Sequence, residues 1–292
     1  MAEIKIGSRS VNIAGANLAY TLEGVGTPVL VVGSSIYYSR TFSENLRRSC
    51  LLVCSDLPHF AQLNPGFEHA SINFDFYAKC IEAVRTAAYL GRVVVIGHSH
   101  HGNAALEYAK RFPHNVSHVV LIGSPPVDVA RTVQAAEQYW ALHASKERRD
   151  SLEKRRTLVD RDQFESLSPK DAYISQYVTD APLYWNDPTY DASWLWEGMT
   201  FDMDAVHAFR NLYQDYELNW NARSLTTPVL IVMGENDYAV PHTLWKEILP
   251  KLQNVTFRVF RQSGHTPQLE RPEEFDHLLL SGLQSESSVL LP

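Results

Sequence analysis

Short apolar runs alternate with amphipathic segments along most of the chain and predict a parallel β-sheet. Five runs rich in Val, Leu and Ile have the length and uniform hydrophobicity of strands buried on both faces, at residues 29–33, 51–56, 93–96, 119–123 and 228–234. Apolar residues with helical spacing follow the second and third runs, over 74–90 and 103–111. This alternation predicts a sheet with helices on both faces.

The ends of the chain complete this pattern. Residues 4–23 alternate as a hairpin does, with Gly15 and Gly24 marking turns, and residues 40–48 can form a short helix. After the strand at 228–234 we expect a helix, a strand over 255–260 and a helix over 272–283. The tail from Ser285 is predicted to be loose.

Residues 125–213 interrupt the alternation, because strand signals disappear there and helical spacing dominates. We therefore predict a helical cap at 125–213, inserted into a core formed by 1–124 and 214–292. Residues 131–170 are rich in Lys and Arg, whereas residues 171–209 contain neither and combine aromatic residues with acids. Such aromatic residues suit a bulky apolar substrate group, and the acids either pair with a substrate amine or cap helices.

Composition narrows the functional classes. The 292 residues are 45% hydrophobic and carry a net charge of −7, which gives no electrostatic reason to expect nucleic acid or an anionic membrane as partner. No apolar run approaches the roughly 20 residues that cross a bilayer, and residues 1–15 lack the apolar block of a signal peptide. The three cysteines, Cys50, Cys54 and Cys80, suggest reduced core thiols. We expect a cytoplasmic protein and leave its oligomeric state open.

The residues around Ser99 have the pattern of an exposed nucleophile. A serine hydroxyl is weakly nucleophilic at neutral pH and needs a base within hydrogen-bonding reach. In the pattern G-x-S-x-G a sharp strand-to-helix turn exposes it, and Gly97 and Ser99 stand in that relation. His101 occupies the place of the second glycine, and Gly102 follows one position later. The alternative is that Ser99 only caps the following helix.

An acid and a histidine follow in the chain order that this turn requires. Asp237 comes just after the strand at 228–234, at the sheet edge where catalytic groups of parallel sheets collect. His265 lies in a loop after the strand at 255–260. We predict that His265 accepts the Ser99 proton while Asp237 fixes the imidazole tautomer. Glu235 is the competitor for the acid role.

These segments resemble the α/β-hydrolase superfamily. The resemblance is carried by Gly97-His98-Ser99, by Gly234-Glu235-Asn236-Asp237 with Val240-Pro241, and by Gly264-His265 followed by Glu270-Arg271-Pro272-Glu273. It points to the capped branch, which includes epoxide hydrolases, haloalkane dehalogenases, lactonases and prolyl iminopeptidases. It implies the α/β-hydrolase fold, with a mostly parallel eight-stranded sheet. Because epoxide hydrolases and dehalogenases of this branch carry aspartate where this chain has Ser99, their activities are disfavoured.

The resemblance also implies an oxyanion hole of two backbone N–H groups. One belongs to His100, the residue after the nucleophile. The other comes from the loop after the first buried strand, where Ser34 is slightly favoured over Ser35. Relatives usually carry His-Gly at that point, and this chain does not.

Several side chains are expected to contact the substrate, namely Tyr37, His59, Tyr184, Trp185 and Trp194. The histidines at 59, 98, 100 and 101 raise the hypothesis of a metal site, since imidazole binds zinc. Alternate residues on a tight turn point apart, however, and no carboxylate or cysteine joins them at ligand spacing. We therefore predict neither a metal nor a cofactor, and place His59 and His100 on the pocket floor.

The favoured function is a serine hydrolase that cleaves an ester or amide of a small, partly aromatic substrate through an acyl-enzyme. The runner-up is an aminopeptidase of the prolyl iminopeptidase type, which would act on a short peptide and is motivated by the acidic aromatic cap. Two further alternatives are a ligand-binding receptor with little turnover and a lyase or carbon–carbon bond hydrolase that uses the same triad.

Overall fold

A nine-stranded sheet forms the centre of the computed structural model, which describes residues 9–221 and 224–285. Its order is β1-β2-β4-β3-β6-β7-β8-β9, with β5 beside β2. The strands are β1 (Arg9–Ile13), β2 (Ala16–Gly24), β3 (Thr27–Gly33), β4 (Cys50–Asp56), β5 (Gln62–Leu63), β6 (Val93–His98), β7 (Val116–Ile122), β8 (Val229–Gly234) and β9 (Val255–Phe260). In the sheet order, the strands β4, β3, β6, β7, β8 and β9 each pair in parallel with the next. Strand β2 pairs antiparallel with β1, β4 and β5. The predicted mostly parallel sheet is confirmed. It contains nine strands instead of the predicted eight, and the additional strand is the two-residue β5.

Successive residues of the central strands point to opposite faces of the sheet and fill two hydrophobic clusters. Val93 and Val95 of β6 belong to the larger cluster, together with buried residues of α3 (Phe74–Ala87) and α4 (His100–Arg111). Val94 and Ile96 belong to the cluster on the other face, which α2 (Glu44–Arg47) and α13 (Pro272–Ser285) cover. Burial on both faces explains why these strands have uninterrupted apolar sequences.

Local structure differs from the prediction at three places. The segment expected as one helix at 40–48 contains only α2, and a separate helix, α1 (Ser35–Ser39), begins after the Ser34 cap. No α-helix forms in the described structure between β8 and β9; 3-10 turns at His242–Trp245 and Leu249–Lys251 connect them instead, with prolines interrupting the segment. Residues 286–292 of the tail lie outside the described residues.

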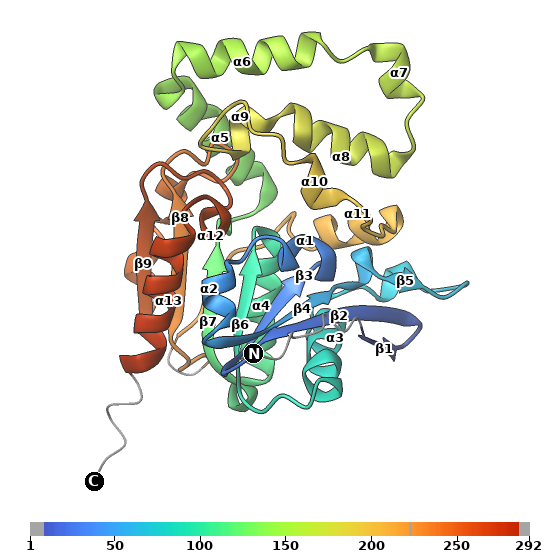
Figure 1. Ribbon diagram of the computed structural model, residues 1–292, viewed down its shortest axis with the longest axis vertical. Helices are drawn as coiled ribbons and strands as arrows, with labels where there is room; N and C mark the ends of the chain where they lie inside the picture. Colours follow the sequence, from blue (N-terminus) through green and yellow to red (C-terminus); the bar gives the residue numbers. More distant parts are fainter. Residues whose placement is uncertain (1–8, 222–223, 286–292) are drawn as a thin grey trace.

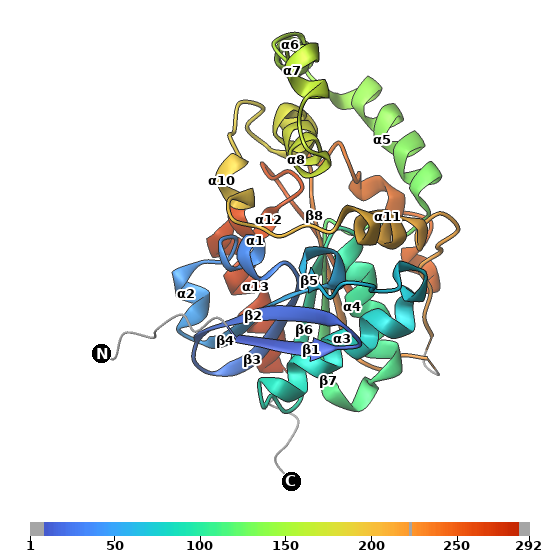
Figure 2. The same ribbon diagram turned by 90° about the vertical axis from the view of Figure 1, so that its right-hand side faces the viewer.

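Helices α5–α11 lie between β7 and β8 in the sequence and stand over the carboxyl ends of the parallel strands (Figures 1 and 2). They are α5 (Val129–His143), α6 (Lys146–Thr157), α7 (Arg161–Glu165), α8 (Pro169–Thr179), α9 (Ala181–Tyr184), α10 (Ser193–Trp196) and α11 (Met203–Asn211). The last of them packs on the core, since Phe209 and the following Tyr213 belong to the larger cluster. Within the described part of the chain, no helix is long and apolar enough to cross a membrane.

Candidate active site

Ser99 lies at a sharp turn between β6 and α4 and has a left-handed backbone conformation. Its φ is 55° and its ψ −138°, values that a serine adopts only under constraint from its surroundings. The constraint includes two backbone hydrogen bonds, from Ser99 N–H to Ile122 O (2.7 Å) and from Gly102 N–H to Ser99 O (3.0 Å). The Ser99 hydroxyl makes no capping hydrogen bond to α4, which removes support for the alternative that this serine serves as a helix cap.

The turn accommodates His101 because glycines stand where neighbours approach it. A Cβ on Gly97 would lie 2.2 Å from the His101 carbonyl oxygen, so only glycine fits there. A Cβ on Gly33, whose φ is +142°, would lie 2.2 Å from Cε2 of Tyr38 and 2.9 Å from Nδ1 of His101. The end of β3 therefore leaves the space that the imidazole at the turn occupies.

Asp237 and His265 meet at the carboxyl ends of β8 and β9. Oδ2 of the fully buried Asp237 lies 2.7 Å from Nδ1 of His265, and its Oδ1 accepts the N–H groups of Ala239 (3.0 Å) and Val240 (2.8 Å). A carboxylate held this way fixes the ring orientation and assigns the proton to Nδ1. Glu235, the competing acid, is exposed and makes no hydrogen bond to His265.

Glu270 fixes the loop that carries His265, a role that we did not predict although the residue belongs to the motif quoted above. Its Oε1 accepts the N–H groups of Gly264 (2.9 Å) and Thr266 (3.3 Å), and its Oε2 accepts that of Asn186 in the cap (2.8 Å). The His265 N–H donates to the Tyr184 carbonyl (2.5 Å). The histidine loop is thus bonded directly to Tyr184, the last residue of α9, and through Glu270 to Asn186 just beyond it.

The backbone beside Ser99 contains two candidate oxyanion donors. The His100 N–H is the first of α4, a position without an intrahelical acceptor. In the turn after β3 the Ser35 N–H donates to Asp56 Oδ1 (2.6 Å). Ser34, in the same turn, lines the same pocket as Ser99 and His265. This engagement of Ser35 favours Ser34 as the second donor.

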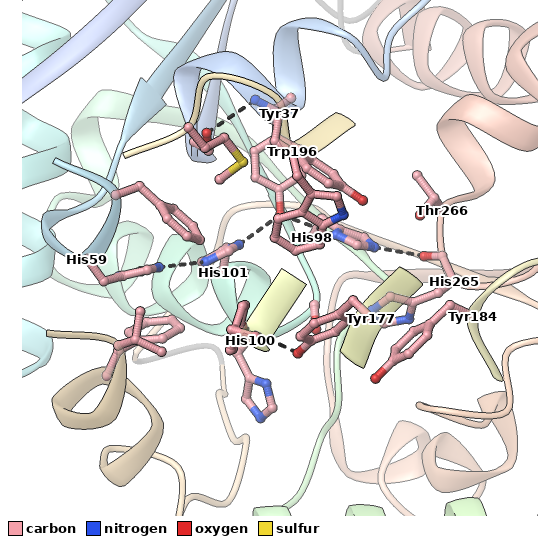
Figure 3. Close-up of a pocket in the computed structure, with 18 of the residues that line it drawn as sticks. Tyr37, His59, His98, His100, His101, Tyr177, Tyr184, Trp196, His265 and Thr266 are labelled. Carbon is pink, nitrogen blue, oxygen red and sulfur yellow. Dashed lines mark hydrogen bonds between the residues drawn. The ribbon is translucent and has the colours of Figure 1, made fainter. Parts of the chain in front are cut away.

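Five side chains form a continuous histidine–tyrosine chain, namely Tyr77, His59, His101, Tyr38 and His98. Figure 3 shows its histidines, His59, His101 and His98, along one side of the pocket. Successive polar atoms are 2.8 Å apart between Tyr77 and His59, 3.0 Å between His59 and His101, 2.8 Å between His101 and Tyr38, and 3.2 Å between Tyr38 and His98. The chain ends where Nε2 of His98 lies 2.8 Å from the His265 carbonyl oxygen.

That carbonyl sets the direction of every hydrogen bond in the chain. A carbonyl oxygen only accepts, so His98 carries its proton on Nε2, and its Nδ1 accepts from the Tyr38 hydroxyl. Tyr38 then accepts from Nδ1 of His101, and Nε2 of His101 accepts from Nε2 of His59. Nδ1 of His59 finally accepts from the Tyr77 hydroxyl. With neutral rings, every ring nitrogen in the chain has a partner.

Burial keeps these imidazoles neutral. It lowers the pKa of His59 to about 3 and holds the pKa values of His98 and His101 well below the ordinary 6.5. The pKa of His100 falls to about 4, first through burial and then through the nearby charges of His265 and Arg210. Near neutral pH these four histidines therefore act as hydrogen-bonding groups without charge.

A pocket opens above this chain and is closed from the cap side mainly by aromatic rings (Figure 3). Of the predicted contact residues, Tyr37, His59, Tyr184 and Trp185 line it. Trp194 does not; its side chain is 39% exposed and its indole N–H donates to the Tyr190 hydroxyl (3.2 Å). Residues two apart in a helix point in nearly opposite directions, and Trp196 lines the pocket in its place. Further cap residues that we did not predict also line it, including Tyr173, Tyr177 and Arg210.

The cap acids serve helix ends and turns and do not line the pocket. Asp202 accepts the Ala205 N–H at the start of α11, and Asp180 pairs with Arg156 (2.8 Å). Asp171, Asp187 and Asp191 accept hydrogen bonds from Ser or Thr residues close in sequence. Of the two readings of these acids, the contacts support helix and turn capping.

Among residues 9–221 and 224–285, no group of three or more His, Cys, Asp or Glu side chains is placed to hold a metal ion. The three cysteines are free and buried, and burial raises the pKa of the Cys54 thiol to about 12.

Comparisons with known proteins identify the family to which the chain belongs. The model of the α/β-hydrolase fold family matches residues 32–272, so the chain belongs to that family, and the protein is a hydrolase. It is 31% identical to the AB hydrolase superfamily protein YclE of Bacillus subtilis over 265 residues, covering 90% of this chain and 93% of YclE. It is 23% identical to a proline iminopeptidase of Heyndrickxia coagulans, covering 86% and 88% of the two chains. An α/β-fold hydrolase from Bacillus anthracis superposes with a TM-score of 0.69 at 18% identity, covering 94% of this chain and 99% of that one.

Proposed function

We propose that this hydrolase cleaves esters of small apolar or aromatic substrates through an acyl-enzyme formed on Ser99. The observation that carries the proposal is the left-handed Ser99 at the β6–α4 turn, in one pocket with a His265 that is hydrogen-bonded to a buried Asp237. This combination supplies a nucleophile, a base and the group that orients the base.

The proposed reaction has two halves. Ser99 Oγ bonds to the ester carbonyl carbon while Nε2 of His265 takes the hydroxyl proton, and the N–H groups of Ser34 and His100 stabilise the oxyanion. The carbon–oxygen bond to the alcohol then breaks, and His265 returns the proton to that alcohol. Water attacks the acyl-enzyme with the same proton transfers, releasing the acid and restoring Ser99.

Labelling with a fluorophosphonate probe tests the nucleophile. Wild-type protein is expected to react and Ser99→Ala to remain unlabelled, with Ser43→Ala, which changes a serine capping α2, as the matched control. Undiminished labelling of Ser99→Ala would refute the assignment. Circular dichroism on each variant separates loss of the nucleophile from loss of the fold.

An ester is favoured over an amino-acyl amide because no carboxylate lines the pocket among the described residues. An aminopeptidase needs an anionic partner for the free amine of its substrate. The test compares an amino-acyl 4-nitroanilide with its N-acetylated form. Strong preference for the free amine would favour the aminopeptidase, although the cap acids are engaged elsewhere.

The complete set of Ser99, His265 and Asp237 argues against a receptor with little turnover. Pre-steady-state measurements with a 4-nitrophenyl ester distinguish the two. Repeated turnover supports the hydrolase, and a single burst with a long-lived complex supports the receptor.

A further inference from the structure

The pocket has an unusual charge distribution. Its lining includes one formally charged side chain, Arg210, and no Asp or Glu among the described residues. The histidines of the floor do not add positive charge near neutral pH, because burial keeps the pKa values of His59 and His100 at about 3 and about 4. A single cation therefore faces an otherwise uncharged, aromatic cavity.

Arg210 lies in α11, and the residue is solvent-exposed as well as lining the pocket. Within residues 9–221 and 224–285 its guanidinium makes neither an ion pair nor a hydrogen bond. Other cap arginines are engaged: Arg148 donates to the Pro182, Trp185 and Asn186 carbonyls, and Arg156 pairs with Asp180. A guanidinium carries five donors in a fixed fork, so one that lines a pocket without a partner is suited to a planar anion.

A second unpartnered group lies in the same pocket. Nε2 of His100 is buried and has no hydrogen-bond partner, while its ring packs on Tyr213 with centroids 4.5 Å apart. Burial has the largest effect on the pKa values of His100, Tyr173 and Tyr184, lowering the first and raising the other two. The charge of Arg210 has a smaller effect and lowers the pKa of all three. The ring of Tyr184 is 5.6 Å from that of His265, and Arg210 lines the same cavity as Ser99 and His265.

We propose that Arg210 binds a carboxylate of the substrate, so that the preferred ester carries a free acid group at the end remote from the scissile bond. The inference rests on the proposed function for the reacting end of the substrate, whereas recognition of the acid is a separate property of the cap.

Binding is measured in Ser99→Ala, so that nothing turns over. Because Trp185 and Trp196 line the pocket, their fluorescence reports binding of 4-phenylbutyrate and of its neutral analogue 4-phenylbutyramide. We expect the acid to bind about 10- to 100-fold more tightly than the amide, the usual range for hydrogen bonds to charged groups. Adding Arg210→Gln should reduce that preference to less than about 3-fold, and Arg210→Lys should retain part of it.

Arg161→Gln is the matched control, because this cap arginine is 89% exposed and pairs with Glu165 outside the pocket. It should keep the full preference for the acid. Equal binding of acid and amide to Ser99→Ala, or a preference that survives Arg210→Gln, overturns the inference. Arg210 also stands in the last turn of α11, where a cation stabilises the helix. A role confined to the helix would lower the thermal unfolding temperature of Arg210→Gln and leave the preference unchanged.

Turnover separates this inference from the proposed function. The substrates are the 4-nitrophenyl monoesters of dicarboxylic acids from succinic to suberic, each compared with the same compound capped as a methyl ester. We expect the ratio of kcat/KM, acid over methyl ester, to peak at one chain length and to collapse in Arg210→Gln. If neither ester is hydrolysed, the proposed function fails and the binding preference is judged by the titration alone. If both are hydrolysed equally, the inference fails and the proposed function stands.

Discussion

On the core side of the pocket each polar group of the histidine–tyrosine chain has a partner. On the cap side aromatic rings surround Arg210, whose guanidinium makes no ion pair or hydrogen bond with the part of the chain that the structure describes. The core side is held by directed hydrogen bonds and by the left-handed Ser99. The cap side is held by ring packing, for example between Tyr177 and Tyr184, whose centroids are 5.1 Å apart. The directed hydrogen bonds thus lie beside the proposed nucleophile, and the packed rings lie where we propose that the substrate is recognised.

The largest expected effect comes from Asp237 on the core side. Asp237→Asn should lower kcat by about 10⁴-fold, because the Ala239 and Val240 N–H groups hold the amide oxygen and leave its NH2 group facing Nδ1 of His265. That NH2 group can only donate, so it favours the wrong tautomer of the imidazole. Steady-state hydrolysis of a 4-nitrophenyl ester measures this.

The control for that variant is Glu235→Gln, which changes the exposed competitor. It should stay within about threefold of wild type, since surface substitutions rarely change free energies by more than about 0.5 kcal/mol. A larger loss in Glu235→Gln than in Asp237→Asn would reverse the assignment of the acid.

The next effect is on stability and comes from the middle of the histidine–tyrosine chain. His59→Leu leaves Nε2 of His101 and the Tyr77 hydroxyl without their partners. The free energy of unfolding should fall by about 2–5 kcal/mol, since each unsatisfied buried group costs about 1–3 kcal/mol. Urea denaturation followed by circular dichroism measures it. His69→Ala, which removes a half-exposed histidine paired with Asp202, should cost less than about 1 kcal/mol.

The buried histidines of the pocket predict how stability depends on pH. The folded pKa of His59 is about 3 and that of His100 about 4, below the 6.5 of an unfolded chain, so between these values the unfolded state binds protons that the folded state does not. The free energy of unfolding should therefore fall as the pH drops below about 6.5, by up to about 1.4 kcal/mol per pH unit for each histidine.

Asp56 offsets part of that loss. Burial raises the pKa of Asp56 to about 6, so between about pH 4 and 6 the folded state binds a proton that the unfolded state lacks. Urea melts at pH 7.0 and 5.0 measure the sum of these contributions. A stability that is unchanged or higher at pH 5.0 would contradict the assignment of neutral, buried imidazoles.

The smallest effect is expected on the cap side. Trp196→Ala should raise KM for an aromatic ester by about 3- to 10-fold, because an aromatic contact contributes about 0.5–1.5 kcal/mol. Trp194→Ala should change KM by less than about twofold, since that ring lies outside the pocket lining. Equal effects of the two substitutions would contradict the placement of Trp196 in the pocket lining and of Trp194 outside it.

Much of the fold follows from local sequence. The strand at 93–96 is apolar throughout because both of its faces are buried, and that signal needs no knowledge of the rest of the chain. The order of Ser99, Asp237 and His265 follows equally, since each residue lies in the loop or turn that follows its own strand.

The rest depends on contacts between distant residues. His101 meets His59 and Tyr38 across 42 and 63 positions, and no spacing rule links these residues. Trp194 and Trp196 differ only in which face of a four-residue helix they occupy, and such a helix is too short for its face to be read from periodicity. Arg210 is distinctive only because its surroundings provide no acid, which the sequence does not display.

The close approach at Gly33 has a consequence for comparing sequences. Since any side chain at 33 would overlap Tyr38 and approach the ring of His101, a histidine at the turn requires a glycine at the end of β3. Gly33 and His101 therefore constitute a two-position signature, separated by 68 positions along the chain, that can be sought in other members of the family. Members that carry a larger residue at the first position are expected to carry a small one at the second.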